Sequence, residues 1–496
     1  MNDVKKVLST LSHNPLCIEV TELARSLDAP LYIVGGAVRD LLIGYPVKDW
    51  DFAGPAAMEL AAKFAETNDA RVVTLHEDQP TARVPVRVGD DEYELYDFCE
   101  LRGDDLEEDL QQRDFTINAI ACDLHDPALI DPLGGIEDLR SRLIRAVHRE
   151  NLQSDPLRCL RAYRFYSQLG FEIEPQTREW IRDLAPELRR VAGQRIGSEL
   201  YQLMYPPRVA GTLDFMDEDG ILAQVLPEIE EGRNMPQPSF HHLPVRAHII
   251  ETARQMERLI LDPTGALPAS YQRLEEYIVG EGIPPMLIMA ALMHDIGKPR
   301  TFSQGEDGRI HFYEHHSQSA QMAQEILTRF AWPTEVRQPV VSFAEQHMRP
   351  FDLAGRGQDG EIEDEDTETF VTMSAIRRMF REVAPHELGL VLLALADSRA
   401  CRGPAVSPEY QLEVELILDD MVYRYFEYKR KQRYEPLLTG QDLIRAGYEP
   451  GPIFSEILEA VKDAHISDEI HTKEQALDIA REIARRHDIE PEQKEE

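Results

Sequence analysis

The chain has 496 residues, of which 43% are hydrophobic and 29% charged, which is typical of a globular protein with roughly three or four domains. Its formal net charge of −37 argues against long, nonspecific contact with a polyanion, because such binding draws on clustered cations. There is no apolar run near the roughly 20 residues of a membrane span, no apolar secretory stretch and no C-x-x-C pair among five cysteines, so we expect a cytoplasmic protein without a membrane partner.

The first part of the chain alternates short strands and helices. A strand over 31–36 ends in two glycines, a helix over 37–44 follows, and a second strand covers 48–54. Further elements of this part are a helix over 56–67, strands over 71–75, 83–89 and 93–98, and a turn and helix within 129–147. This order predicts a small head with a mixed sheet.

From Asp155 onward the pattern is helical, with no further strong strand signal, so we expect an all-α remainder. The predicted fold class is therefore α+β, and the acidic stretch over 355–370 is typical of a solvated insertion. The expected domains are a head over 1–147, a helical neck over 148–232, a histidine-rich helical domain over 233–405 and a helical tail over 406–496.

One short stretch of this acidic chain is basic. Residues 139–200 carry twelve arginines, no lysine and eight acidic residues. The planar guanidinium of arginine suits bidentate contacts with phosphates and bases better than the lysine ammonium does. The pattern predicts that the protein binds a nucleotide or RNA locally, in the neck.

The head contains a pattern suited to phosphate chemistry. Asp49 and Asp51 are two residues apart on a strand and so point to the same face, where they can hold two Mg²⁺ ions. Gly35 and Gly36 precede a helix whose first turn carries Arg39, so backbone N–H groups and a guanidinium are offered to a triphosphate. A Gly-Gly turn or a D-x-D pair alone is usually unspecific, but together on this frame they predict nucleotidyl transfer.

A third metal-binding carboxylate is expected on the strand YELYDF. We predict Glu94 for this role, with Asp97 as the alternative.

Several phrases in the same order carry a family resemblance. They are GGAVRD…DWDF, QRDFTINAIA, LIDPLGGIEDL, SDPLRCLRAYRFYSQLGF and, near the end of the chain, LLTGQDLIRAGYEPGPIFSEIL. Over residues 30–204 and 437–458 the chain resembles the bacterial class II tRNA nucleotidyltransferase/poly(A) polymerase family, of the polymerase-β nucleotidyltransferase superfamily. The resemblance implies an enzyme that adds C, A or both to a tRNA 3′ end from CTP and ATP, with Mg²⁺ at the head.

The resemblance also assigns nucleotide-binding residues. Gly36 and Arg39 would contact the triphosphate, and Arg113 and Asn118 would lie near the sugar and phosphates. The incoming base would be read by an Asp–Arg pair on the neck helix, supported by two further arginines; these residues are Asp155, Arg158, Arg161 and Arg164. A carboxylate accepts from the amino group that C and A share, while an arginine donates to the ring nitrogen or carbonyl oxygen.

Two positions depart from the family pattern. Ser154 stands where the family usually has Glu, which bears on base selectivity, and Gln112 stands where it usually has Arg, which weakens one phosphate or sugar contact. The alternative for the neck arginines is a solvated helix face with i, i+3 spacing. Arg195 is expected to be a structural ion-pair partner.

A second constellation is rich in histidine. The pieces H…HD-x-G-K…H…H…D occur in order and resemble the HD-type metal-dependent phosphohydrolase domain. The resemblance implies His248, His294, Asp295 and Asp397 as ligands of a first transition-metal ion, with His315 and His347 completing a second site. Lys298 would contact the phosphate, whereas His241, His242 and His316 are expected to be core or supporting residues.

Three alternatives to a tRNA-specific enzyme follow from these patterns. A poly(A) polymerase differs only in acceptor and nucleotide. A phosphohydrolase or cyclic phosphodiesterase would place the main activity in the HD domain. A non-enzymatic RNA-binding scaffold is disfavoured because Arg39, Asp49 and Asp51 are all present.

Overall fold

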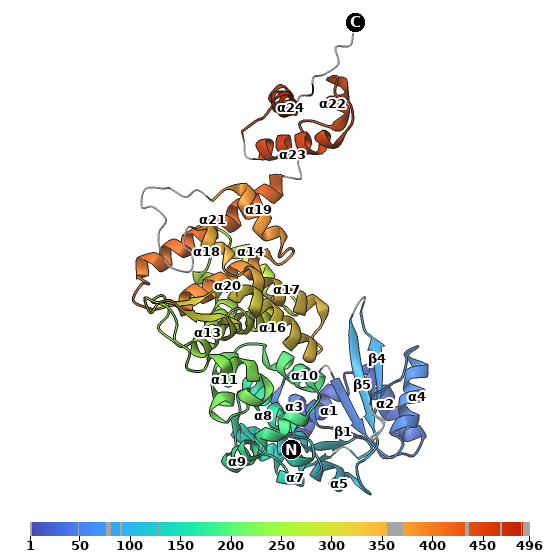
Figure 1. Ribbon diagram of the computed structural model, residues 1–496. Coiled ribbons are helices and arrows are strands. Elements are labelled where there is room, and N and C mark those ends of the chain that lie inside the picture. The colour runs from blue at the N-terminus through green and yellow to red at the C-terminus, as the bar shows by residue number, and fades with distance from the viewer. Residues whose placement is uncertain are drawn as a thin grey trace.

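The computed structural model describes residues 2–47, 49–75, 81–89, 92–126, 128–354, 371–431, 436–466, 469–487 and 489. The head lies at one end of the molecule and the helical tail at the other (Figure 1). The acidic stretch 355–370, expected to be a solvated insertion, lies outside the described residues.

The head is built on a seven-stranded sheet with the order β3-β4-β5-β2-β1-β6-β7. Its strands are β1 (Tyr32–Val34), β2 (Asp49–Ala53), β3 (Val73–Thr74), β4 (Thr81–Arg87), β5 (Tyr93–Cys99), β6 (Ala121–Asp123) and β7 (Leu129–Ile130). β2 and β5 run parallel and the other neighbouring pairs run antiparallel, so the sheet is mixed, as predicted.

The two faces of this sheet have different neighbours. Phe52, Tyr96 and Phe98 pack with Phe64 of α4 in a buried aromatic group on one face. The head helices are α1 (Asn2–Leu11), α2 (Pro15–Ser26), α3 (Gly36–Ile43), α4 (Ala57–Thr67), α5 (Leu106–Gln111) and α6 (Gly135–Ser141), with a 3₁₀ turn η1 (Thr116–Asn118). Because side chains alternate along a strand, Asp49 and Asp51 lie on the opposite face of β2 from Phe52.

The neck is helical except for a minimal strand pair, β8 (Leu143–Ile144) and β9 (Glu172–Ile173). Its elements are α7 (Arg149–Ser154), α8 (Leu157–Leu169), α9 (Pro175–Leu184), η2 (Ala185–Arg190), α10 (Gly193–Leu203), α11 (Val209–Glu218), α12 (Leu222–Val225) and η3 (Pro227–Gly232). The expected helical remainder is confirmed, with this pair and one hairpin as the exceptions among the described residues.

The histidine-rich domain follows the neck. Its elements are α13 (Val245–Leu261), η4 (Pro263–Gly265), α14 (Tyr271–Ile278), α15 (Ile283–Met293), η5 (Lys298–Thr301), α16 (His315–Arg329), α17 (Thr334–Gln346), α18 (Arg349–Leu353), α19 (Met373–Arg381) and α20 (Glu387–Ala400). A hairpin, β10 (Phe302–Gln304) and β11 (Ile310–Phe312), precedes α16. Its strands are three residues long, too short for the alternation that would have revealed them.

The neck and this domain meet at a close helix contact. The carbonyl of Gly197, on α10, accepts a hydrogen bond from Trp332 Nε1 at 2.9 Å. A Cβ added at Gly197 would collide with the backbone oxygen of Phe330, at the end of α16. Glycine is therefore required here by close approach, and a continuous hydrophobic core runs from the head through this contact.

The last helices are α21 (Pro408–Lys431), α22 (Gly440–Arg445), α23 (Pro452–Ile466) and α24 (Lys473–Arg486). α21 packs on α20 and shares the large core, whereas α22–α24 enclose a small core of their own around Leu443 and Ile457. No single helix in the described part of the chain is long and apolar enough to cross a membrane, although one helix pair bent by 99° passes by length and composition.

Candidate functional site

The glycine turn after β1 brings backbone close to charged side chains. Gly35 has φ +68°, a conformation that L side chains rarely adopt, and a Cβ there would lie 2.8 Å from Arg113 Nη1. The next residue, Gly36, begins α3. The turn therefore leaves room beside Asp51, whose Oδ2 would be 3.6 Å from the same Cβ.

Three carboxylates share the open face of the sheet. Asp49 and Asp51 alternate with buried Trp50 on β2, and the parallel register sets Asp51 beside Asp97 of β5. Asp97 accepts two hydrogen bonds from Arg83, at 2.8 and 2.7 Å. Burial and the neighbouring Asp97 carboxylate raise the pKa of Asp51 to about 7. A cluster of acidic groups that oppose each other's ionisation fits a site for a cation.

Glu94 lies outside this cluster. It is three residues from Asp97 on the same strand, and strand alternation turns it to the other face. There it accepts hydrogen bonds from Tyr96 Oη at 2.5 Å and from Asn14 Nδ2 at 3.4 Å. The prediction that Glu94 joins Asp49 and Asp51 is therefore wrong, and its alternative, Asp97, is the residue that lies beside Asp51.

The raised pKa of Asp51 predicts a pH dependence of stability. Without metal, the folded protein holds a proton up to about pH 7 that the unfolded chain releases near its ordinary pKa of 3.8. The free energy of unfolding should therefore fall as pH rises through this window, because the folded state binds more protons. Thermal melts of wild type and Asp51→Asn in chelator would measure the difference. An equal slope in both proteins would contradict it.

The expected triphosphate contacts are fixed by a chain of polar partners. Arg39 donates from Nη1 to Asn118 Oδ1 at 2.7 Å and from Nε to Asp40 at 2.8 Å. Arg113 donates from Nε and Nη2 to the buried Asp109, at 3.0 and 2.9 Å. Both guanidinium groups are thus held in place by carboxylates or amides rather than by packing alone, which suits a site that must hold charge in a set geometry.

The neck arginines are anchored in the same way. Arg161 donates to Asp114 at 3.0 Å and to Glu199 at 2.9 Å, and Arg164 donates to the second oxygen of Glu199 at 2.7 Å. Burial raises the pKa of Asp114, but Arg161 and Asn118 offset this and hold it at about 2. These arginines are therefore not a solvated helix face, the alternative considered from the sequence.

The predicted base-reading pair lies at the start of α8. Arg195 donates to Asp155 Oδ2 at 2.9 Å, the structural role expected of it. Asp155 Oδ1 is buried and has no hydrogen-bond partner among the described residues. Arg158 donates from Nη1 to the carbonyls of Gln112 and Asn151, at 3.0 and 3.2 Å. One acceptor oxygen of the pair is thus unsatisfied by the described residues.

Many of these residues line a common cleft of about 700 Å³, although Asp49, Asp97 and Asp155 are not among its lining residues. Of the sequence-predicted residues, the cleft brings together Gly35, Gly36, Arg39, Asp51, Arg113, Asn118, Arg158, Arg161 and Arg164. Sequence reasoning missed Arg102, Asp114 and Phe165, which also line it. The Phe165 ring lies under the guanidinium groups of Arg39 and Arg164, 4.9 and 4.4 Å from its centroid. Of these three residues, Asp114 could have been predicted, because it directly follows Arg113 in the motif QRDFTINA.

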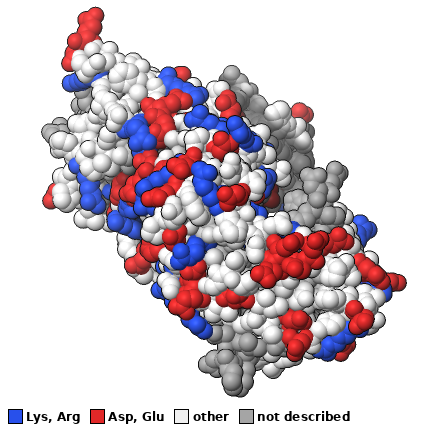
Figure 2. Space-filling model, turned by 90° about the horizontal axis from the view of Figure 1, so that it is seen from below, with Lys and Arg blue, Asp and Glu red and all other residues white. Residues whose placement is uncertain are grey.

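Away from this cleft the surface charges are mixed. On the face shown in Figure 2, basic side chains lie among acidic ones rather than in a separate basic area. In the neck, for example, Arg178 and Arg182 both donate to Asp219. The basic stretch seen in the sequence is therefore largely balanced by carboxylates in the fold.

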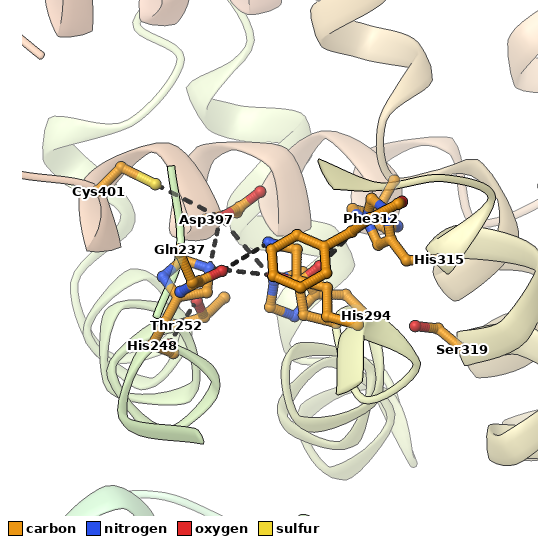
Figure 3. Close-up of polar contacts among 12 residues, drawn as sticks. Gln237, His248, Thr252, His294, Phe312, His315, Ser319, Asp397 and Cys401 are labelled. Carbon is orange, nitrogen blue, oxygen red and sulfur yellow. Dashed lines mark hydrogen bonds and ion pairs between the residues drawn. The ribbon is translucent and has the colours of Figure 1, made fainter. Parts of the chain in front are cut away.

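The histidine-rich domain gathers a second site. All six predicted ligands converge, from α13, α16, α20 and the residues that directly follow α15 and α17. Figure 3 labels four of them, His248, His294, His315 and Asp397. His248 Nε2 lies 3.4 Å from Asp295 Oδ2 and 3.0 Å from Asp397 Oδ1, and His294 Nε2 lies 3.2 Å from Asp295 Oδ2. The other oxygen of Asp295 faces His315 Nε2 at 3.3 Å and His347 Nε2 at 3.5 Å. Asp295 thus stands between two sets of imidazoles.

The imidazoles are oriented by the backbone. His294, His315 and His347 each place Nδ1 2.8–2.9 Å from a carbonyl oxygen, which turns Nε2 toward Asp295. Burial lowers the pKa of His315 to about 4, so its ring is neutral, as a metal ligand must be. Burial raises the pKa of Asp295, but His294 and Lys298 together bring it well below its usual value.

Several buried polar atoms of this site lack a hydrogen-bond partner among the described residues. His248 Nε2, His294 Nε2 and Asp295 Oδ1 make no aligned hydrogen bond within the described residues. Lys298 Nζ lies 2.5 Å from Asp295 Oδ2 and donates to Gln237 at 2.9 Å. This donor set fits divalent metal ions. His242 and His316 lie outside the groups of close ligand atoms formed by the described residues, whereas His241 joins one of them.

Family models match three parts of the chain. They are described as a poly A polymerase head domain (residues 31–145), a probable RNA and SrmB-binding site of polymerase A (170–232) and an HD domain (245–400).

Curated relatives match nearly the whole chain. An A-adding tRNA nucleotidyltransferase of Deinococcus radiodurans is 33% identical, covering 90% of this chain and 93% of the relative. A CC-adding tRNA nucleotidyltransferase of Thermus thermophilus is 30% identical, covering 91% and 94%. Among solved structures, the Thermotoga maritima CCA-adding enzyme complexed with tRNA has a TM-score of 0.62 at 21% identity, covering 97% of this chain and 98% of that one. The last similarity shows a shared fold.

Proposed function

Because the chain belongs to the tRNA nucleotidyltransferase family, we propose that it is a template-independent enzyme that adds C, A or both to the 3′ end of tRNA from CTP and ATP. The observation that carries the proposal is Asp51, which has Asp49 on its own strand and Asp97 beside it on β5, and which lines a cleft together with several arginines.

In the proposed mechanism the head holds the reacting groups. Asp49 and Asp51, with Asp97 alongside, would hold Mg²⁺, which supplies Lewis acidity to the attacking hydroxyl and the triphosphate. The Gly35–Gly36 turn offers backbone N–H groups to phosphate oxygens. Arg39 and Arg113, each held by its own partners, would neutralise the triphosphate and the negative charge that develops on the pyrophosphate as it leaves. The ordered arginines thus act by positioning charge in advance.

The base is proposed to be read at α8. The buried, unpartnered Asp155 Oδ1 would accept from the exocyclic amine of C or A. G and U present a carbonyl oxygen at the corresponding position, which would face this carboxylate and repel it. With Ser154 in place of the family's Glu, Arg195 supplies the contact that holds Asp155.

We propose that the HD centre holds divalent transition-metal ions and gives the chain an associated phosphohydrolase activity. His248, His294, Asp295 and Asp397 would hold one ion, and Asp295, His315 and His347 the other. Lys298 lines the adjoining pocket and would contact a phosphate bound there.

The four segments expected from the sequence are proposed as functional units. The helices at the end of the chain support the last of them, because they have a separate core that spans Leu438–Ala484.

The function is tested by extension of a labelled tRNA transcript ending at the discriminator base, C or CC. Each NTP is supplied singly, and CTP and ATP together, with Mg²⁺ and an unstructured control RNA. Addition of CC, A or CCA to the tRNA supports the proposal and assigns the nucleotides. Long ladders on the control RNA with ATP alone would identify a poly(A) polymerase instead.

Base choice gives a separate prediction. Asp155→Ala removes the acceptor, so discrimination of C and A against U and G should fall by about 10-fold or more, one hydrogen-bonded contact being worth roughly 1–3 kcal/mol. The measurement is single-turnover incorporation of each NTP. Asp183→Ala, an exposed neck carboxylate, is the control. Unchanged selectivity in Asp155→Ala would show that the base is read elsewhere.

A further inference from the structure

Beside the histidines of the HD centre lies a thiol. Asp397 and Cys401 are four residues apart at the end of α20, so they project from consecutive turns toward the same place (Figure 3). Cys401 Sγ lies 3.9 Å from Asp397 Oδ1, the oxygen that is 3.0 Å from His248 Nε2. No sequence motif joins Cys401 to the histidines, since it belongs to no cysteine motif.

A fourth donor faces the same point. His241 comes from the loop before α13, and its ring meets that of His248 edge-on with centroids 4.6 Å apart. Its Nδ1 is buried and without a hydrogen-bond partner among the described residues. Ligand atoms of His241, His248, Asp397 and Cys401 all lie within 4.8 Å of one another.

We propose that the metal ion held by His248 and Asp397 takes Cys401 as a thiolate ligand and His241 as a further imidazole, which makes this position selective for a thiophilic ion such as Zn²⁺. The proposal rests on the metal-binding role proposed above for His248 and Asp397, and adds the identity of the ion and two ligands. Binding releases the thiol proton to solvent.

The spacing fits such an ion. Neighbouring ligand atoms bound to one zinc ion at about 2.0–2.3 Å stand roughly 3–4 Å apart. The Sγ–Oδ1 and Nε2–Oδ1 separations of 3.9 and 3.0 Å lie within this range. The Asp295–His315–His347 group has only nitrogen and oxygen donors. The two metal positions of the HD domain therefore differ in ligand type, because only one of them includes a soft sulfur ligand. A thiophilic ion should occupy the position that includes Cys401 first.

The alternative is that Cys401 is a small packing residue near the pocket. Cobalt distinguishes the two, because a thiolate bound to Co²⁺ gives an intense sulfur-to-metal charge-transfer band and a packed thiol does not. The experiment titrates the full-length, metal-stripped protein with Co²⁺ and records the near-ultraviolet spectrum, then displaces the cobalt with Zn²⁺.

The expected result is a charge-transfer band that saturates at one Co²⁺ per chain. Cys401→Ser should abolish the band and weaken binding at this position by at least about 10-fold. His241→Gln, which keeps the thiol, should retain a shifted band and also bind more weakly. Cys99→Ser is the matched control, since it too is a partly buried cysteine, in the head, and should behave as wild type.

Several results would overturn the proposal. Cobalt binding without a charge-transfer band would leave the HD ions in place but remove Cys401 from them. The same conclusion follows if Cys401→Ala and Cys401→Ser keep the band. Failure of wild type to bind cobalt at all would overturn both this proposal and the metal-binding role of His248 and Asp397. Circular dichroism of each variant shows whether it is folded.

Discussion

Asp51→Asn is expected to reduce nucleotide addition by at least about 10³-fold while the protein stays folded. Asp51 is partly buried beside the carboxylate of Asp97, and it lies next to the Gly35 turn on the face of the sheet that lines the cleft. An uncharged amide of the same shape removes a metal-binding charge worth several kcal/mol in the transition state, and each 1.36 kcal/mol is tenfold in rate.

The measurement is single-turnover extension of tRNA, with nucleotide binding followed separately. Nucleotide affinity should change far less than the rate, because Arg39 and Arg113 are untouched. Glu59→Gln, an exposed carboxylate on α4 in the same head, controls for the loss of a negative charge. Near-normal extension by Asp51→Asn would refute the assignment of the active-site carboxylates.

The second large effect is expected at the HD centre, where Asp295→Asn should remove bound metal from both positions. One oxygen of Asp295 faces His248 and His294 and the other faces His315 and His347. Loss of its charge therefore weakens two sites at once, whereas His347→Ala should weaken one. Metal content per chain after loading and gel filtration measures both.

Nucleotide addition serves as the internal control for these variants. Its residues lie in the head and neck, so Asp295→Asn should lose metal and any phosphohydrolase activity but extend tRNA at the wild-type rate. His316→Ala removes a neighbouring histidine outside the ligand groups and should keep full metal content. Equal metal loss in His347→Ala and Asp295→Asn would contradict the bridging position of Asp295.

Local sequence was enough to place the groups whose geometry depends on short spacing. The D-x-D pair needed only strand alternation, and the histidine pieces occurred in the order of a known domain. The choice between Glu94 and Asp97 could not be made in this way, because it depends on the register between β2 and β5. That register pairs residues more than 40 positions apart in the sequence.

Side-chain partners contributed by distant helices could not be predicted from the sequence either. Glu199 binds Arg161 and Arg164 across 38 and 35 residues, and nothing in the motif on α8 indicates it. Cys401 and His241 likewise come together only through the packing of α20 beside α13. The sequence thus indicated the groups proposed to react, while the residues that orient them are apparent only in the tertiary structure.

The contact at Gly197 constrains how this protein can change during evolution. α10 carries both Arg195 and Glu199, which hold residues of the helix proposed to read the base, and its glycines lie against the end of α16. A homologue that lost every proposed metal ligand of the HD domain would still need the C-terminal end of α16, because α10 packs against it. The proposed metal centre and the surface that packs on α10 can therefore be selected separately. Loss of the metal ligands need not be followed by loss of the folded domain.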